Sequence, residues 1–202
     1  MSTDRTAIAV ASWRNELPTL TGRSVVLREP AAADLSALVD LLAVADACRF
    51  GLEAHDSAAV RQLIDRASRD RTNGVAFSYA IASSSSHAVV GLLQVRQLDP
   101  LFEAAEWECT IAPSARGTGV FIEAMRLAAS FAFASVGTHR LEIRVPLQNG
   151  RASGALRKLG AVQEGILRKS LRRGSEYFDQ VLWALLKEDW RHDGAATSPR
   201  VH

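Results

Sequence analysis

One short segment, Arg116-Gly117-Thr118-Gly119, constrains the fold of this chain more than any other. It lies between a strand-like run at residues 106–112, ended by Pro113, and a long apolar run at residues 120–136 with helical periodicity. A strand, a glycine loop and a helix in that order leave backbone N–H groups unpaired at the start of the helix, where the helix dipole favours negative charge. The segment therefore predicts an anion site that fits a pyrophosphate.

The glycine loop differs from two common phosphate-binding motifs. It has no Gly-Lys-Ser/Thr, which a Walker A loop requires. It also lacks the third glycine and the early βαβ position of a dinucleotide fingerprint. Taken alone, a Gly-x-Gly segment is equally compatible with an ordinary tight turn.

Strand and helix patterns surround this unit. Three-to-four spacing of apolar residues predicts four helices. The first covers residues 31–46, and the second begins at Ser57 as N-cap and ends at the turn Asn73-Gly74. The third covers residues 120–136 and ends at Gly137, and the fourth covers residues 151–159 and ends at Gly160. Alternating or β-rich runs predict strands over residues 24–28, 76–82, 88–97, 106–112, 140–145, 161–170 and 177–186. Four serines between the second and third of these strands favour an antiparallel hairpin. The mixture of predicted helices and strands is that of the α/β (α+β) class.

Length and composition indicate one compact domain. A chain of 202 residues, 48% hydrophobic and 23% charged, suffices for one large core but not for two. A turn signal before the first strand places the domain at residues 20–190, with an N-terminal arm at 1–19 and a polar flexible tail at 191–202. The net charge of +2 gives no field that would indicate nucleic acid, so we expect a small molecule or a protein end as partner.

Metal, disulfide and membrane functions receive little support from the sequence. Cys48 and Cys109 lie far apart, and the five histidines form no His-x-x-x-His pair, so we expect no metal. The apolar run at residues 7–11 is too short for a signal core. We expect a cytoplasmic protein without a membrane partner.

A series of motifs in order resembles one known family. The motifs are Ala105-Glu106-Trp107-Glu108-Cys109-Thr110-Ile111-Ala112-Pro113, then Arg116 to Gly119 and Glu123-Ala124, then Arg140-Leu141-Glu142, Asn149-Gly150-Arg151, residues 156–161, Glu164-Gly165, residues 179–183 and residues 188–190. With these motifs the chain resembles the GNAT acetyltransferases, particularly the ribosomal-protein N-terminal acetyltransferases of the RimJ/RimL type. The resemblance covers residues 20–190 and is far more specific than the glycine loop.

The resemblance implies a fold and a co-substrate. The fold is a mixed, mostly antiparallel, twisted sheet of about seven strands with about four helices, splayed between the strand ending at Ala112 and the strand 140–145. Acetyl-CoA would enter this split, its pantetheine along the first strand edge and its pyrophosphate on the loop amides. The implied cofactor-binding residues are Thr110, Ile111, Ala112, Arg116, Gly117, Thr118, Gly119, Val120, Asn149 and Arg151.

Two residues depart from the family pattern. Phe121 replaces a small residue at the end of the glycine motif, where a ring could narrow the loop. Ala152 stands where relatives often carry a serine that is thought to protonate the leaving thiolate, and the nearest serine is Ser153. One helical position rotates a side chain by about 100°, so Ser153 does not simply inherit that role.

Acetyl transfer to an amine needs a base, a polarised carbonyl and a proton for the thiolate. Glu106 and Glu108 lie two apart on one strand, hence on the same face, and are the candidate general bases; the alternative is that both are solvent-facing strand residues. A backbone N–H near Ile111 or Ala112 would polarise the carbonyl. Ser153, Tyr177 or solvent would protonate the thiolate. Cys109 has no adjacent His or Asp, which favours direct transfer over an acyl-enzyme.

Three functions compete. The first is an N-acetyltransferase that moves acetyl from acetyl-CoA directly to a primary amine of a protein N-terminus or small molecule. The second is a non-catalytic acyl-CoA-binding or sensing domain, and the third is an interaction protein on a degenerate form of the fold. Exposed sheet edges would allow a homodimer. For the basic run Arg168, Lys169, Arg172 and Arg173, a solvated hairpin is favoured over a site for an acidic substrate or the CoA 3′-phosphate.

Overall fold

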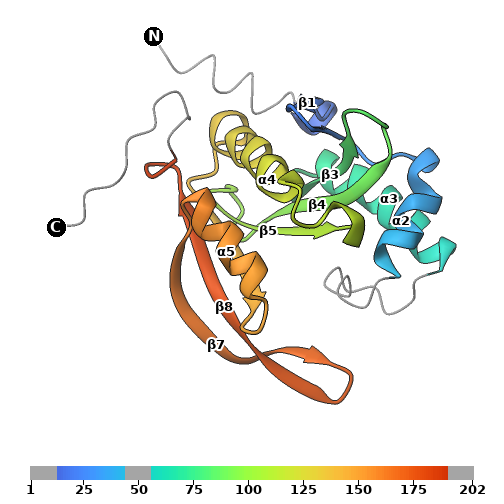
Figure 1. Ribbon diagram of the computed structural model, residues 1–202. Helices are drawn as coiled ribbons and strands as arrows, with labels where there is room; N and C mark the ends of the chain where they lie inside the picture. Colours follow the sequence, from blue (N-terminus) through green and yellow to red (C-terminus); the bar gives the residue numbers. More distant parts are fainter. Residues whose placement is uncertain (1–12, 44–55, 191–202) are drawn as a thin grey trace, which may run out of the picture.

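One continuous sheet organises the part of the chain that the computed structural model describes, residues 13–43 and 56–190 (Figure 1). Its strand order is β1-β2-β3-β4-β5-β6-β8-β7. The strands are β1 (Leu20–Thr21), β2 (Val25–Arg28), β3 (Ala76–Ser83), β4 (Val89–Gln97), β5 (Ala104–Ile111), β6 (Arg140–Pro146), β7 (Val162–Arg173) and β8 (Glu176–Leu186). Among the described strands, only β5 and β6 pair in parallel, which confirms the predicted mixed, mostly antiparallel sheet. The additional strand is β1, whose residues the sequence placed in a turn.

The helices follow the predicted periodic runs with local differences at their ends. They are α2 (Leu35–Leu42), α3 (Ser57–Thr72), α4 (Val120–Phe131) and α5 (Gly150–Leu159), with short 3-10 turns η1 (Ala32–Asp34) and η3 (Pro113–Ala115) and a π turn η4 (Ala132–Val136). The N-cap of α3 is Asp56, whose carboxylate accepts from the Ala59 N–H at 2.7 Å, and the prediction of Ser57 as cap is wrong by one residue. Gly160 ends α5 at φ +91°, as predicted. Residues 44–46 of the first predicted helix lie outside the described residues.

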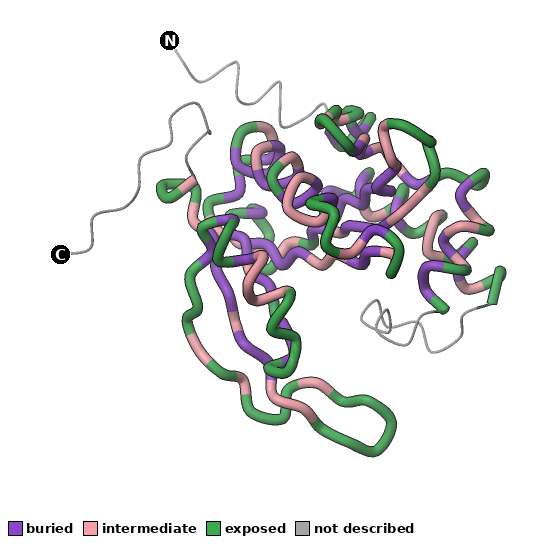
Figure 2. The backbone as a smooth tube through the Cα atoms, viewed as in Figure 1, coloured by how far each residue is buried: buried purple, intermediate pink, exposed green. Residues whose placement is uncertain are grey.

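The two faces of the sheet carry different helices. Leu92 belongs to a small core with α2 and α3, whereas its neighbour Leu93 belongs to the main core with α4 and α5. Because adjacent strand residues point to opposite faces, α2 and α3 cover one face and α4 and α5 cover the other. Figure 2 shows the buried residues concentrated on the sheet and on the inner sides of these helices.

The main core begins before the predicted domain boundary at residue 20. Trp13 is 1% exposed and packs edge-on against Phe77 and Phe102, and Leu17 is buried beside it. The described part of the predicted arm, residues 13–19, therefore packs against the domain. Trp183 is 2% exposed and lies in the core, as predicted.

The sheet splits between β5 and β6. These strands pair at three positions, Ala104 with Arg140, Ala105 with Leu141 and Glu106 with Glu142. Beyond these positions β5 continues to Ile111 and β6 to Pro146, but in the described structure the two strands no longer pair with each other. We call this unpaired part of the two strands the fork. Its base is closed by the N–H groups of His139 and Arg140, which both donate to the Glu103 carbonyl, at 2.7 and 2.9 Å.

The last two strands form a long hairpin that projects from the body of the molecule (Figure 1). The strands extend beyond the predicted ranges, so the turn lies at residues 174–175, slightly later than the predicted Arg172-Arg173-Gly174. The four basic side chains of this hairpin are exposed, as the solvated interpretation predicts. Among the described residues, no helix has both the length and the apolar character needed to cross a membrane.

Candidate functional site

The glycine loop between η3 and α4 has the backbone form of an anion site. Gly117 and Gly119 have φ of +84° and +92°, values that residues other than glycine rarely adopt. A Cβ at either glycine would meet nothing within 4 Å, so the backbone on this side is open to a ligand. Gly119 is the N-cap of α4 and has no side chain with which to cap the helix, so first-turn N–H groups are left for a ligand.

Two contacts fix the loop from within. The Thr118 hydroxyl donates to the Ala115 carbonyl at 2.7 Å, and Arg116 Nε donates to the Ile111 carbonyl at 3.2 Å. The second contact joins the loop directly to the end of β5. Phe121 packs against the main core, so its ring is directed into the protein and does not narrow the loop.

The register of β5 determines which of its amides face the fork. Pairing with β4 is anchored by Leu98 N–H to the Ala104 carbonyl and by Ala112 N–H to the Val90 carbonyl, both at 2.8 Å. Hydrogen-bonded pairs alternate along an antiparallel ladder, so the even-numbered residues from 104 to 112 bond to β4. The backbone groups of Cys109 and Ile111 point the other way, into the fork.

This register changes two sequence-based expectations. Of the predicted segment Thr110 to Ala112, only Ile111 presents its N–H to the fork, because Thr110 and Ala112 are bonded to β4. Ala112 N–H is therefore not available to polarise a carbonyl. The backbone of Cys109 lines the fork, and sequence reasoning missed it. Alternation along the strand shows that the backbone groups of Cys109 and Ile111 point the same way. Whether they point to β4 or to the fork depends on the register of β4 and β5.

The glutamates of β5 lie together on the face opposite α4, as their spacing predicted. Glu106 is buried and ion-paired: Arg96 Nη2 lies 2.5 Å from Oε2, and Arg144 Nε lies 3.5 Å from Oε1. Glu108, half-buried, lies two residues nearer the loop and opposite Gln94 of β4. Both oxygens of Glu106 face guanidinium groups, so a substrate amine would compete with two arginines there.

Other carboxylates near the base of the fork are also matched by arginine. Arg140 Nε binds Glu142 at 2.8 Å, and the same guanidinium binds both oxygens of Glu164, with one contact at 2.8 Å. These bonds raise the pKa of Arg140, with the Glu164 hydrogen bond as the largest cause, and lower the pKa of Glu164. The face beside the fork is therefore a set of alternating charges.

The start of α5 holds the remaining predicted residues. Asn149 is the N-cap, and its Oδ1 accepts from the Ala152 N–H at 3.1 Å, while Asn149 and Arg151 are both exposed. Ala152 packs against the main core. Ser153 is half-buried, and no described residue makes a side-chain hydrogen bond to its hydroxyl. Tyr177 is 57% exposed and pairs with Arg172 next to the hairpin turn, beyond the end of β6.

The thiol of Cys109 is poorly suited to covalent catalysis. It is a free cysteine on β5 that packs against the main core. Burial raises the pKa of the Cys109 thiol well above its usual range, so the nucleophilic thiolate is scarce at neutral pH. Within residues 13–43 and 56–190, no three His, Cys, Asp or Glu side chains gather as a metal site would require.

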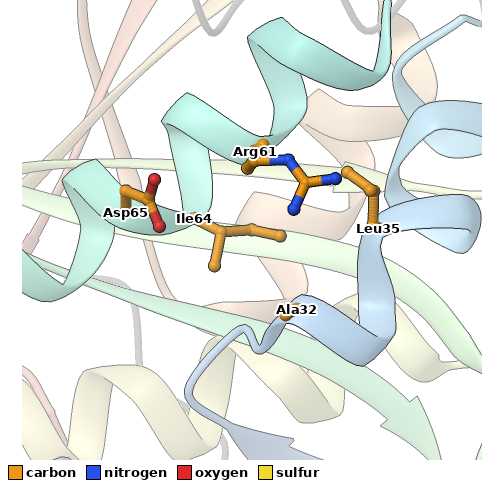
Figure 3. Close-up of a pocket in the computed structure, with 5 residues that line it drawn as sticks. All are labelled: Ala32, Leu35, Arg61, Ile64 and Asp65. Carbon is orange, nitrogen blue, oxygen red and sulfur yellow. The ribbon is translucent and has the colours of Figure 1, made fainter.

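A surface pocket elsewhere has no part in this arrangement. It lies between η1, α2 and α3 and is lined by Ala32, Leu35, Arg61, Ile64 and Asp65. Figure 3 shows Arg61 reaching from α3 toward Leu35, with Asp65 one turn along the same helix. None of the fork or loop residues lines it.

Comparisons with known proteins agree with this geometry. The family model described as "Acetyltransferase (GNAT) domain" matches residues 24–162, more than half of the chain. YdaF of Bacillus subtilis (strain 168), whose name gives ribosomal N-acetyltransferase as a provisional function, is 26% identical over 103 residues, which are 51% of this chain and 56% of YdaF. The chain spans about half the length of the curated relatives it matches.

Solved structures share the fold over most of both chains. RimJ of Mycobacterium smegmatis, in complex with CoA-disulfide, matches with a TM-score of 0.72 and 21% identity over 85% of this chain and 87% of that chain. Spermidine N-acetyltransferase from Vibrio cholerae, in complex with CoA and spermine, matches with a TM-score of 0.72 and 18% identity over 82% and 97%. At these identities the likeness concerns the fold alone.

Proposed function

Because the chain belongs to the GNAT acetyltransferase family and resembles its RimJ/RimL-type branch, we propose that it transfers acetyl from acetyl-CoA directly to a primary amine. That amine is a protein N-terminus or belongs to a small molecule. One observation carries the proposal: β5 turns the backbone of Cys109 and the N–H of Ile111 toward the fork, without a strand partner among the described residues, and it is followed by the amide-rich glycine loop. A strand edge followed by an anion site matches a ligand with an amide-containing arm and a pyrophosphate.

The residues available fit acetyl-CoA in a definite order along the chain. The amides from Gly117 to Val120 would hold the pyrophosphate, with Arg116 on the same loop. The backbone of Cys109 and Ile111 would pair with the pantetheine as a neighbouring strand does. Asn149 and Arg151, exposed at the start of α5, would contact the co-substrate from the other side of the fork.

The chemistry assigns one task to each group. Acetyl-CoA supplies the acetyl thioester. The Ile111 N–H polarises its carbonyl, since this donor faces the fork and has no strand partner among the described residues. Glu108 orients the amine and accepts its proton, directly or through water, with Glu106 holding Arg96 and Arg144 in place. Ser153 or solvent returns a proton to the thiolate, and much of the rate comes from positioning.

An acceptor with one amine fits this site better than a polyamine does. Glu106, Glu142 and Glu164 are each paired with an arginine, so this face offers little uncompensated negative charge to a polycation. A peptide with a free N-terminus should therefore be acetylated faster than spermine. Mass spectrometry of both acceptors tests this, with an N-acetylated lysine peptide to separate the α-amine from the ε-amine. Faster acetylation of spermine contradicts it.

The first experiment is acetyl-CoA binding by calorimetry to the wild type, Gly119→Glu and Gly137→Glu. Gly119 and Gly137 have φ of +92° and +97° and open space around the position of a Cβ, so the two changes impose similar strain. We expect loss of binding only in Gly119→Glu, whose carboxylate would repel the pyrophosphate. Absence of wild-type binding would refute the proposal. Binding without turnover on a broad amine panel would favour the sensing domain, which Ala152 motivates.

A further inference from the structure

A carboxylate beside the glycine loop makes contacts that point away from the loop. Glu123 lies in the first turn of α4, and its side chain binds the turn between β1 and β2. The Arg23 N–H and the Ser24 hydroxyl both donate to it, and the Ser24 N–H lies 3.2 Å from each of its oxygens. Three donors from a segment about a hundred residues away in sequence therefore hold this one carboxylate.

The turn is shaped around this contact. The Gly22 N–H donates to the Val25 carbonyl at 2.8 Å and closes the turn. A Cβ at Gly22 would meet the end of the Glu123 side chain, so a larger residue here would require the carboxylate to shift. Glycine at this position leaves room for the carboxylate against the turn.

The same residue is bonded to the anion loop through its backbone. Glu123 N–H donates to the carbonyl of Gly119, the N-cap of α4, at 3.0 Å. Its side chain meanwhile holds the start of β2, which pairs with β3 from Val25 to Arg28. Glu123 thus connects the last glycine of the loop to the sheet.

The contacts of Glu123 with the Gly22–Ser24 turn also determine the charge of its carboxyl group and where that charge is directed. Burial acts to raise the pKa of the Glu123 carboxyl, but the hydrogen bonds from Ser24 and Arg23 outweigh it and the pKa is lowered. The group is therefore ionised at neutral pH. A negative charge in a first helical turn competes with a bound anion for the helix dipole. Here the carboxylate accepts its hydrogen bonds from the Gly22–Ser24 turn, so the loop amides are left for a ligand.

We infer that Glu123 is a positioning residue of the acetyl-CoA site, which binds the Gly22–Ser24 turn and thereby fixes the glycine loop in the form that receives a pyrophosphate. This inference rests on the proposed function. It predicts that loss of the contact weakens the part of acetyl-CoA affinity that depends on the pyrophosphate.

The test compares two ligands on matched variants. Glu123→Gln keeps the size of the side chain and removes its charge, and Glu188→Gln does the same at an exposed site after β8. Affinity for CoA is measured by calorimetry, and affinity for S-acetylpantetheine, which has no pyrophosphate, by ligand-observed NMR. In Glu123→Gln we expect the Kd for CoA to rise about tenfold and the Kd for S-acetylpantetheine to change less than about twofold. Glu188→Gln should match the wild type with both ligands.

Two results would overturn the inference: a CoA Kd within about twofold of wild type, or an equal loss for both ligands, which a purely structural role produces. If circular dichroism shows that Glu123→Gln does not fold, Ser24→Ala removes one donor and should raise the CoA Kd about threefold with the same ligand selectivity. The proposed function fails separately, when wild-type protein does not bind CoA. Wild-type binding that is lost in Gly119→Glu but kept in Glu123→Gln removes only the present inference.

Discussion

Arg96 of β4 binds Glu106 of β5 at 2.5 Å, and Glu106 occupies the last position at which β5 pairs with β6. An ion pair thus marks the point where the sheet divides. Arg144, on the far side of the division, lies 3.5 Å from the other oxygen of the same carboxylate. Glu106 therefore links the two strands where their backbone pairing ends.

Substitutions of the two glutamates of β5 should have different effects, one on catalysis and the other on stability. Glu108→Gln should lower kcat about a hundredfold, the scale of a lost general base. Glu106→Gln should mainly lower the free energy of unfolding, by about 1–3 kcal/mol, because it leaves Arg96 and Arg144 without their carboxylate. Steady-state kinetics and urea denaturation of each variant measure the two effects. Wild-type turnover in the double variant would exclude both residues as the base.

Cys109 should resist alkylation at neutral pH. Burial raises the pKa of its thiol, so the reactive thiolate forms only as the pH becomes strongly alkaline. In a Cys48→Ser background, the rate of reaction with iodoacetamide at pH 7 should be at least about tenfold below that of a free cysteine peptide, and urea should abolish the difference. Rapid modification of the folded protein at pH 7 would contradict this and reopen an acyl-enzyme route.

Asp34 should contribute to stability in a pH-dependent way. Arg28 binds both of its oxygens at 2.7 Å, and the Ala31 N–H donates at 2.8 Å. Burial acts to raise the pKa of Asp34, but these bonds outweigh it and the pKa is lowered. The contribution is therefore complete above the unfolded-state pKa, about 3.9, and is lost as the pH falls through the lower folded-state value.

Urea denaturation of Asp34→Asn and the wild type tests this. At pH 7 the variant should lose about 1–3 kcal/mol, and the difference should shrink below about pH 4. Asp40→Asn, at an exposed position of α2, is the control and should change stability little at either pH. A difference that stays constant down to pH 2 would show that the ion pair is not the cause.

Trp13 should be as important to stability as a residue within the predicted domain. Its ring centroid lies 5.8 Å from that of Phe77 and 5.7 Å from that of Phe102. Trp13→Ala should cost about 3–5 kcal/mol, the usual effect of removing a buried aromatic ring. Thermal unfolding measures this against Glu16→Ala, an exposed neighbour that should have little effect. Equal melting temperatures would mean that the described arm does not stabilise the core.

Local sequence patterns predicted the loop, most of the strands and the ends of several helices. Gly117, Gly119 and Gly160 have the positive φ values that make glycine informative, and the alternation in β6 is a direct consequence of its burial. Errors occurred where two equivalent signals lay side by side, as with Asp56 and Ser57 at the start of α3. The family resemblance placed the split between the correct strands.

The rest depended on partners distant in sequence. The identity of the β5 amides that face the fork depends on the pairing of β4, which no pattern within β5 reveals. The contact between Glu123 and Ser24 joins residues 99 positions apart, and Trp13 finds its partners on β3 and in the loop before β5. Such contacts form from the packing of whole elements, so a single sequence contains little sign of them.

The fork has a consequence for solvent exchange. Strand edges usually lie at the periphery of a sheet, but here an edge runs through its interior, between two strands that are hydrogen-bonded on their other sides. A ligand that pairs with Cys109 and Ile111 would complete the ladder as a short additional strand. The amide protons of these two residues would then exchange with water slowly in the bound protein and quickly in the free one, while their neighbours Thr110 and Ala112, already bonded to β4, would be protected in both.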